Sequence, residues 1–303
     1  MIVVALALFE VGTRANVMPG TSDLVRYRAF PERARELVAA PGTSMAFVGN
    51  SVTDRIRVED MRREWQAITG APLRAEKFVA YYSNLTTWYW MSNQYFLKPG
   101  LKPDLIVVTY FEGNALADLP VLDVGNLALF FTDREDRASL FEYDLTTLEL
   151  RASYLVSSAS EAFAARDRIR DRMLNFIPGH RPYATAVNDI NFEHERRRKL
   201  AAPEPPRTFH TLGRFLADAR EAGVTICFVA FPMRPGPAGD RSYIIHPRAR
   251  EMIDSSGMIH LDLRDLDELT GSMYTDNVHL NSLGASIYTR KFAETLNEAW
   301  RPR

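Results

Sequence analysis

The chain contains a single cysteine, Cys227, among its 303 residues. An intrachain disulfide needs two cysteines, so none can form, and no cysteine-based metal cluster can be assembled. Cys227 lies in the apolar run 224–230, where a cysteine behaves as a small buried hydrophobic side chain. The cysteine count leaves the cellular compartment open, since exported proteins can lack disulfides.

The chain also lacks an excess of charge of either sign. It has 37 Lys and Arg against 38 Asp and Glu, giving a formal net charge of −1. No overall field therefore attracts nucleic acid, and we expect no nucleic-acid partner. No metal-ligand spacing stands out, so no metal or other cofactor is implied. With 46% hydrophobic and 25% charged residues, the composition is that of a globular protein with a full-sized core.

Long hydrophobic runs are scarce, and the apolar start of the chain is short. Residues 1–9 are apolar before Glu10 and Arg14 close the run. As a helix they would rise about 14 Å, against roughly 30 Å of bilayer hydrocarbon, and no basic segment or cleavage site marks a signal peptide. Two interpretations stay open: a packed terminal helix, or the end of a membrane anchor whose start lies upstream. We favour the anchor and treat residues 1–20 as a separate segment.

Apolar runs alternate with amphipathic patterns along the rest of the chain. Continuous Val- and Ile-rich runs separated by helices are typical of a parallel sheet covered on both faces. The fold class predicted is therefore α/β, a three-layer α/β/α sandwich with a mostly parallel sheet. Strands are expected at 45–48, 78–82, 105–110, 224–231 and 258–263, and helices at 58–68, 86–97, 208–222 and 282–300.

The stretch from about residue 119 to 206 interrupts this alternation. It contains a long charged helical pattern near 152–176 and ends in the proline-rich 203–206. We interpret it as a largely helical insertion in a single domain spanning 21–303. The insertion would cap the sheet as a surface subdomain, or act as a lid or docking surface for a partner.

Polar residues with catalytic potential follow the ends of two predicted strands. Ser51 comes directly after the first strand, in the sequence Gly-Asn-Ser, and Asn114 follows the third. The carboxyl ends of the strands are where α/β sheets place their ligands. Gly49 permits a tight turn before the hydroxyl, and an Asn side chain can donate to a developing oxyanion. Each signal alone is also typical of an ordinary turn or helix cap.

A third motif, Asp-x-x-His, stands just before the last predicted helix. Asp276 lies three residues ahead of His279 and can accept a hydrogen bond from its Nδ1. The other ring nitrogen is then free to take a proton from a serine hydroxyl. On its own, His279 could equally cap the helix.

Together the three motifs resemble the SGNH/GDSL hydrolase superfamily, over roughly residues 40–115 and 208–300. The resemblance implies Ser51 as nucleophile, His279 as general base and Asp276 as its orienting partner. It also implies an oxyanion hole formed by the Ser51 N–H and the Asn114 side chain. The superfamily's further glycine donor is missing after the second strand, and Ser83 would supply that N–H.

The motifs depart from the superfamily pattern in two more places. Asn50 replaces the usual Asp of Gly-Asp-Ser, and Ala115 follows Asn114 where an Asp is usual. Such departures, with the apolar start, resemble the extracytoplasmic SGNH-like proteins of bacterial polysaccharide O-acetylation systems. These include the alginate acetylation proteins and the D-alanylation protein of teichoic acids.

The expected activity is acyl-ester chemistry through an acyl-Ser51 intermediate, as an O-acetyltransferase or acetylesterase on a cell-envelope or exported polysaccharide. The resemblance implies an acyl donor, a carbohydrate acceptor and a membrane-bound O-acyltransferase partner, at a periplasmic or cell-surface location. Two alternatives remain. One is a catalytically inactive scaffold that binds polysaccharide or the transferase partner; the other is a cytoplasmic esterase in which the apolar start is packing.

Overall fold

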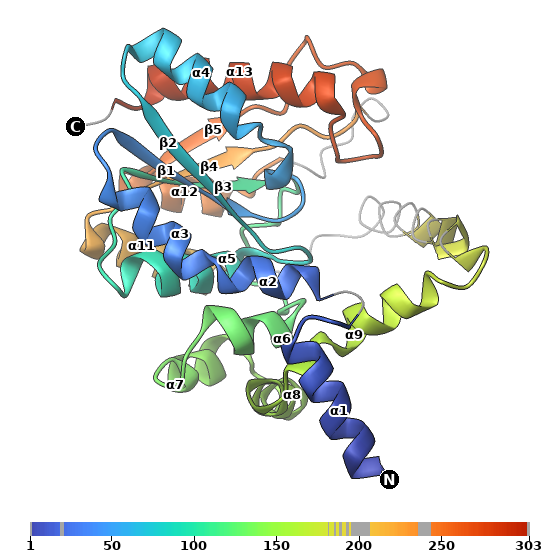
Figure 1. Ribbon diagram of the computed structural model, residues 1–303. Helices are drawn as coiled ribbons and strands as arrows, with labels where there is room; N and C mark the ends of the chain where they lie inside the picture. The colour runs from blue at the N-terminus through green and yellow to red at the C-terminus, as the bar shows by residue number, and fades with distance from the viewer. Residues whose placement is uncertain are drawn as a thin grey trace. The chain divides into compact units, whose positions relative to one another are not determined.

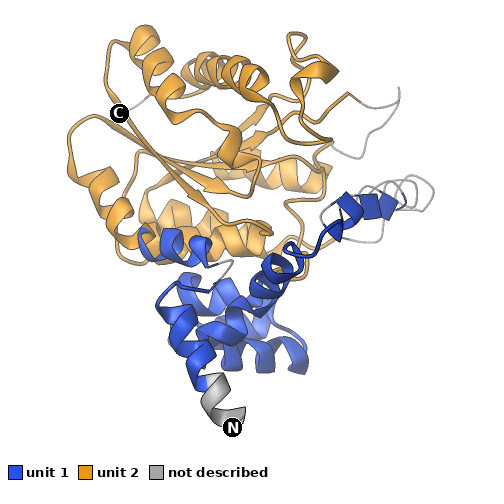
Figure 2. Cartoon of the chain, turned by 45° about the vertical axis from the view of Figure 1, so that its right-hand side comes forward, with its two compact units in different colours: residues 1–29, 123–206 blue, residues 30–122, 207–303 orange. Residues whose placement is uncertain are grey.

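The protein divides into two compact units, coloured separately in Figure 2. Unit 1 comprises residues 1–29 and 123–206, and unit 2 comprises residues 30–122 and 207–303. The N-terminal segment and much of the predicted insertion thus fall into one unit. The computed structural model describes residues 2–18, 21–180, 182–184, 186–187, 190–191, 194, 207–235 and 244–301.

Unit 2 contains a five-stranded sheet in the order β2-β1-β3-β4-β5, with every neighbouring pair parallel (Figure 1). The strands are β1 (Thr43–Gly49), β2 (Leu73–Val79), β3 (Leu105–Tyr110), β4 (Thr225–Ala230) and β5 (Ile259–Asp262). All seven residues of β1 and all six of β3 are buried, because helices cover both faces of the sheet. The predicted parallel α/β fold is confirmed.

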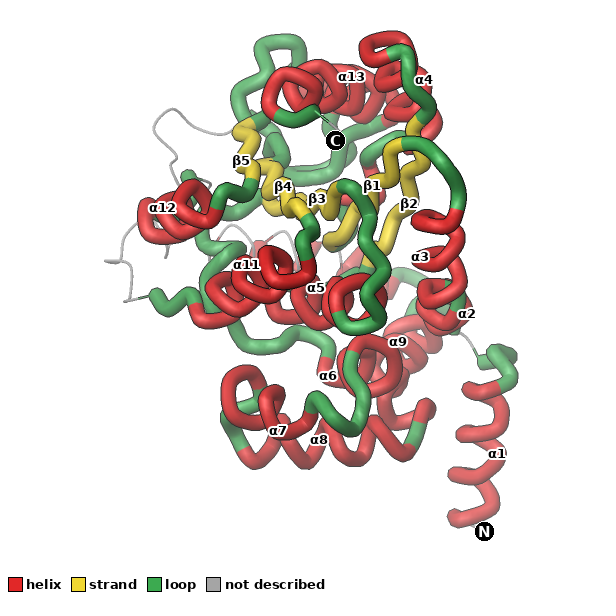
Figure 3. Tube along the Cα trace, turned by 90° about the vertical axis from the view of Figure 1, so that its left-hand side faces the viewer, coloured by secondary structure: helices red, strands yellow, loops and turns green. Residues whose placement is uncertain are grey.

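Helices form a layer on each side of these strands, as Figure 3 shows. Helices α4 (Val58–Thr69) and α13 (Ser282–Ala299) lie on one face. On the other face lie α3 (Phe30–Ala39), α5 (Leu85–Ser92) and α11 (His210–Ala222). Helix α12 (Pro247–Ser256) contacts β5 and α11, and the π-helical turn Asn93–Leu97 continues α5. The predicted three-layer sandwich is confirmed.

Aromatic side chains fill both interfaces between the sheet and its helices. Phe47 of β1 meets Phe292 of α13 edge to face, with ring centroids 6.0 Å apart. On the other face every residue of α5 is buried, including Trp88 and Trp90. The aromatic cluster of this helix therefore belongs to the core.

The second strand differs from its prediction at 78–82. Strand β2 runs instead from Leu73 to Val79, at the edge of the sheet. Its half-exposed positions carry charges: Glu76 pairs with Arg33, and Lys77 pairs with Asp54. Because of these charges the first half of the strand has no continuous apolar run, so the sequence pattern did not predict it.

The described residues of unit 1 form helices joined by turns and loops. Its longer helices are α1 (Ile2–Arg14), α2 (Ser22–Arg28), α8 (Leu148–Ala159) and α9 (Glu161–Leu174). The shorter elements are α6 (Val124–Asn126), α7 (Arg137–Ser139) and the π-helical turns Leu127–Phe131 and Leu140–Asp144. Tyr27 packs edge-on against Phe130 and Phe131, with ring centroids 5.4 and 5.5 Å away.

Across the residues described, no helix combines the length and apolarity that a bilayer span requires. The membrane anchor and the extracytoplasmic location stay predictions.

The charged helical pattern near 152–176 forms two helices rather than one. The break falls at Ser160, whose backbone is extended and whose hydroxyl accepts the Phe163 N–H at 3.1 Å. Such a side-chain cap starts a new helix, because it satisfies an N–H that lacks a partner in the first turn. The helical pattern predicted there is confirmed, with a break at Ser160 that the pattern did not indicate.

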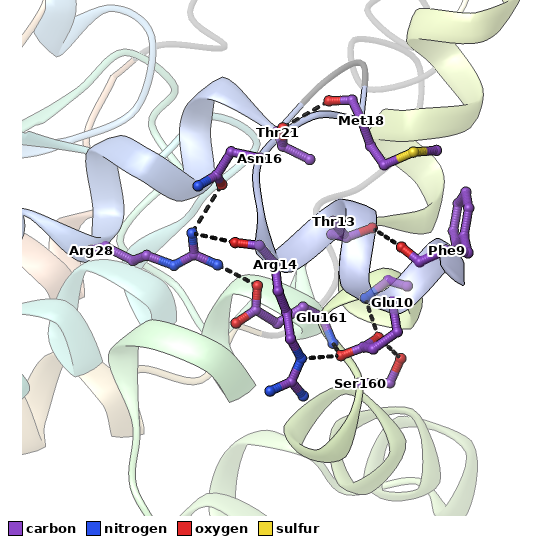
Figure 4. Close-up of polar contacts among 11 residues, drawn as sticks. Phe9, Glu10, Thr13, Arg14, Asn16, Met18, Thr21, Arg28, Ser160 and Glu161 are labelled. Carbon is purple, nitrogen blue, oxygen red and sulfur yellow. Dashed lines mark hydrogen bonds and ion pairs between the residues drawn. The ribbon is translucent and has the colours of Figure 1, made fainter. Parts of the chain in front are cut away.

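Glu10 of α1 reinforces this cap from a distant part of the sequence (Figure 4). Its carboxylate accepts the N–H groups of Glu161 and Ala162, both at 3.0 Å, and the Ser160 hydroxyl at 2.7 Å. Arg14 donates to the same carboxylate at 2.7 Å. Partial burial acts to raise the pKa of Glu10, but these donors outweigh it and lower that pKa to about 2. The first turn of α9 thus ties α1 into unit 1.

Replacing Glu10 with glutamine is expected to destabilise the start of α9 by about 0.5–2 kcal/mol near neutral pH. The pKa of Glu10 is lowered on folding, so its contribution is complete above about pH 4.5 and is lost as the pH falls toward 2. Hydrogen exchange of the Glu161–Phe163 amides at pH 7 and pH 3 measures this, with the exposed Glu149→Gln as control. A Glu10→Gln effect no larger than the control, or one that does not shrink at low pH, would contradict the capping role.

Candidate active site

The order of the strands indicates where a ligand would bind in unit 2. After β1 the chain moves outward to β2, and β3 then pairs with the other side of β1. In open α/β sheets of this order, ligands bind outside the carboxyl ends of the strands, where the strand order reverses. Ser51 follows β1 and Asn114 follows β3, so both stand at this edge.

The turn that carries Ser51 has little freedom. A side chain on Gly49 would overlap the Thr53 hydroxyl and approach that of Thr109 at 3.0 Å. These two hydroxyls hydrogen bond to each other. Asn50 accepts the Val52 N–H through Oδ1 at 3.2 Å, as Asn residues do in tight turns. Asn50 thus shapes the turn.

His279 bridges the serine and the aspartate singled out from the sequence. Its Nε2 lies 2.8 Å from Ser51 Oγ, and its Nδ1 lies 2.7 Å from Asp276 Oδ2. A carboxylate can only accept, so Nδ1 carries the proton and Nε2 accepts the serine hydroxyl. The structure therefore brings Ser51, His279 and Asp276 into one hydrogen-bonded chain.

The loop holding Asp276 and His279 is closed by its own backbone. Asp276 Oδ1 accepts the N–H groups of Val278 at 2.9 Å and His279 at 2.8 Å. Thr275 donates its N–H to the His279 carbonyl at 2.8 Å. Asn281, not His279, caps α13 by accepting the Gly284 N–H at 3.0 Å. The His279 side chain therefore bonds to Ser51 and does not cap the helix.

The carboxylate of Asp276 stays ionised around neutral pH. Partial burial acts to raise its pKa, but the N–H groups of Val278 and His279 and the imidazole outweigh this and hold the pKa below its usual range. A fixed negative charge at Nδ1 stabilises the imidazolium that forms when His279 takes a proton. The side chains of Asp276 and His279 are 52% and 20% exposed, so the dyad stands at the surface.

Asn114 occupies a turn that depends on the preceding glycine. A side chain on Gly113 would overlap the backbone carbonyl of Ile244, and the Gly113 carbonyl accepts the His246 N–H at 3.3 Å. Asn114 itself is half-buried, and its carbonyl accepts the Ala117 N–H at 3.0 Å. Its role as oxyanion donor stays a prediction.

Ser83, the other predicted oxyanion donor, uses its hydroxyl within its own turn. The hydroxyl donates to the Ala80 carbonyl at 2.5 Å and accepts the Trp88 indole N–H at 2.8 Å. Any contribution to an oxyanion would come from the backbone N–H, and this role also stays a prediction. The turn lies at the carboxyl end of β2, next to the strand that leads to Ser51.

Sequence reasoning missed the polar side chains that support the Ser51 turn. Besides Thr53 and Thr109, Asp54 accepts the Lys77 ammonium and the Tyr81 hydroxyl, each at 2.9 Å. These contacts join residues 23 and 27 positions apart, so no local motif marks them. The available signal was the cluster of hydroxyl and acidic residues directly after Ser51.

Ser51, His279 and Asp276 are the chemically competent groups of this edge. Within the part of the chain that the structure describes, no group of three or more His, Cys, Asp or Glu side chains is arranged to hold a metal ion. The chemistry available from the three residues is nucleophilic attack by a hydroxyl with proton transfer through imidazole.

Comparison with known proteins gives likeness in structure only. No family model matches the sequence, and no curated protein matches it. Among solved structures, the chain is similar to Axe2, an acetylxylan esterase from Geobacillus stearothermophilus, at 13% identity and a TM-score of 0.43, covering 88% of this chain and 100% of that one. A catalytic mutant of the same enzyme gives a TM-score of 0.44 at 13% identity, over 86% and 96% of the two chains. The acetyl xylan esterase AlAXEase gives 0.38 at 12% identity, over 82% and 98%. Because these TM-scores lie below 0.5, the likeness carries no argument about activity.

Proposed function

We propose that this protein is a serine-dependent acyl-ester enzyme that forms a covalent acyl intermediate on Ser51. The observation that carries the proposal is the chain of two hydrogen bonds, 2.8 Å from Ser51 to His279 and 2.7 Å from His279 to Asp276. A nucleophile, a base and a group that orients the base are the parts that this chemistry needs. The resemblance of these motifs to the SGNH/GDSL superfamily points the same way.

The reaction begins with attack of Ser51 Oγ on the carbonyl carbon of an ester. His279 Nε2 takes the hydroxyl proton as the C–O bond forms, and the Asp276 carboxylate stabilises the imidazolium. The tetrahedral intermediate collapses when His279 returns that proton to the leaving alkoxide, which departs as an alcohol. The acyl group then remains on Ser51 as an ester.

The second half repeats the steps with a new nucleophile. Water or a sugar hydroxyl gives its proton to His279 Nε2 and attacks the acyl carbon, and the same proton returns to Ser51 as the acyl group leaves. Water as acceptor makes the protein an esterase, and a sugar hydroxyl makes it an O-acyltransferase. The balance depends on how well the bound acceptor excludes water.

The oxyanion of both intermediates needs hydrogen-bond donors. We assign this role to the Ser51 N–H and the Asn114 side chain, with the Ser83 N–H as a third donor. The turns that carry Asn114 and Ser83 follow β3 and β2, at the same edge of the sheet as the Ser51 turn. A single donor of this kind is worth about 10²–10³ in rate.

The substrate we propose is an acetyl ester on a polysaccharide of the cell envelope or an exported one. The surface position of the dyad, with Asp276 52% exposed, supports access by a large substrate. An extracytoplasmic location and a membrane-bound O-acyltransferase as partner belong to the same proposal, and the resemblance to O-acetylation proteins is their only support.

The proposal is tested by turnover and trapping on the whole chain. We expect release of para-nitrophenol from para-nitrophenyl acetate, and a fluorophosphonate adduct that peptide mass spectrometry places on Ser51. Addition of candidate oligosaccharides separates acetyl transfer to sugar from release of acetate. If the protein neither turns over the ester nor takes up the label, the catalytic proposal fails and the scaffold alternative replaces it.

A further inference from the structure

One exposed aromatic side chain at the catalytic edge has an unusual backbone. Tyr82 follows β2, its side chain is largely free of protein contact with 79% of its surface exposed, and its φ angle is +53°. Among the described residues other than glycine, only Asn16 and Tyr82 have positive φ. Asn adopts this conformation readily, whereas the Cβ of a Tyr is crowded against its own backbone there.

The residues before Tyr82 are bound to both sides of the Ser51 turn. Ala80 donates its N–H to the Gly49 carbonyl at 3.0 Å, two residues before the nucleophile. The Tyr81 hydroxyl donates to Asp54 Oδ2 at 2.9 Å, three residues after the nucleophile. The turn carrying Tyr82 is therefore fastened directly to the turn carrying Ser51.

The residues after Tyr82 are held just as firmly. Ser83 bonds to the Ala80 carbonyl at 2.5 Å and to the Trp88 indole at 2.8 Å. The Asn84 amide donates to the Pro120 carbonyl at 2.8 Å. With both neighbours fixed, the backbone of Tyr82 is held in its left-handed conformation, and its ring is exposed to solvent on a turn that is bonded to the Ser51 turn.

Resting on the proposed function, we propose that Tyr82 is the platform on which the sugar ring of the ester substrate stacks. The faces of a sugar ring expose C–H groups, which pack on an aromatic face, while the phenol hydroxyl can bond to sugar hydroxyls. A tyrosine on a rigid backbone orders only two side-chain torsions when it binds, so little conformational entropy is lost. The adjacent Tyr81 bonds to Asp54, which also pairs with Lys77, and these polar and charged groups beside the turn favour a sugar over a lipid chain.

The backbone of Tyr82 makes the proposal separable from folding. Glycine adopts positive φ without the steric cost, and asparagine tolerates it. Tyr82→Gly and Tyr82→Asn are therefore expected to fold as well as the wild type, with a melting temperature that is not lowered. Tyr82→Trp keeps an aromatic face and is expected to keep its function.

The test compares a substrate without a sugar to substrates with one. The substrates are para-nitrophenyl acetate and partially O-acetylated oligosaccharides of glucose, mannose and xylose, with the oligosaccharide that the wild type turns over fastest used for the variants. We expect Tyr82→Gly and Tyr82→Asn to lower kcat/KM for that oligosaccharide about tenfold through KM, and to leave para-nitrophenyl acetate unchanged within about twofold. Tyr82→Trp should restore the oligosaccharide value, and Tyr183→Asn, at another highly exposed tyrosine, should change neither substrate.

The outcomes separate the two proposals. If the wild type turns over neither kind of ester, the proposed function fails and Tyr82 loses its role with it. If it turns over para-nitrophenyl acetate but no acetylated oligosaccharide, the sugar assignment is overturned while the ester chemistry stands. Equal losses on both substrates, or no loss on the oligosaccharide, would also overturn the platform role.

Discussion

Replacing Ser51 with alanine is expected to lower kcat/KM for para-nitrophenyl acetate by about 10³-fold or more, and to abolish labelling by a fluorophosphonate. His279→Ala should lose a similar factor, because the hydroxyl then lacks the base that accepts its proton at 2.8 Å. Neither side chain belongs to the buried core, since both are only partly buried, so we expect both variants to fold. Activity of each purified variant, corrected for uncatalysed hydrolysis, measures the loss.

The double variant is the sharper form of this experiment. When two residues act in the same step, removing the second costs little once the first is gone. The kcat/KM of the double variant Ser51→Ala, His279→Ala should therefore lie within a few-fold of that of either single variant. Ser255→Ala, at an exposed serine of α12, is the matched control and should retain full activity. Additive losses, or a Ser51→Ala variant within tenfold of the wild type, would show that the hydroxyl and the imidazole do not act as a pair.

The parts of the fold that sequence predicted well are those whose signal is local and apolar. Strand β3 begins at Leu105 and ends at Tyr110 as expected, because both of its faces are buried and it opens with four consecutive Leu, Ile and Val residues. The predicted start of strand β2 lay five residues after the observed one. The first half of this edge strand carries charged side chains at its partly exposed positions, so it shows no continuous apolar run. The break between α8 and α9 was missed because Ser160 looks like any polar residue within a charged helix.

The candidate site divides in the same way between local and distant contacts. The bond from His279 to Asp276 spans three residues, so spacing alone predicts it. The contact from His279 to Ser51 spans 228 residues, and only resemblance to a family placed the two together. No sequence signal predicted the left-handed backbone of Tyr82. It is held by bonds of the two neighbouring residues, from Tyr81 to Asp54 and between Ser83 and Trp88. Sequence thus predicts the chemistry better than the surface that would select a substrate.

Asp276→Asn is expected to lower kcat/KM by about 10²–10⁴-fold without moving the loop. Asparagine Oδ1 can still accept the Val278 and His279 N–H groups, now at 2.9 and 2.8 Å, which places its NH₂ group against the imidazole. An NH₂ group donates, so Nδ1 must accept and the ring proton moves to Nε2. His279 then offers a proton to Ser51 instead of taking one. The loss of kcat/KM therefore measures the change of the His279 tautomer and not a change in the fold.

The alanine variant at the same position gives a second, independent result. Asp276→Ala, which also leaves the two loop N–H groups without their acceptor, should lose at least as much activity and melt at a lower temperature. An asparagine variant within about threefold of the wild type at every pH would reduce the catalytic unit to Ser51 and His279, with Asp276 only shaping the loop.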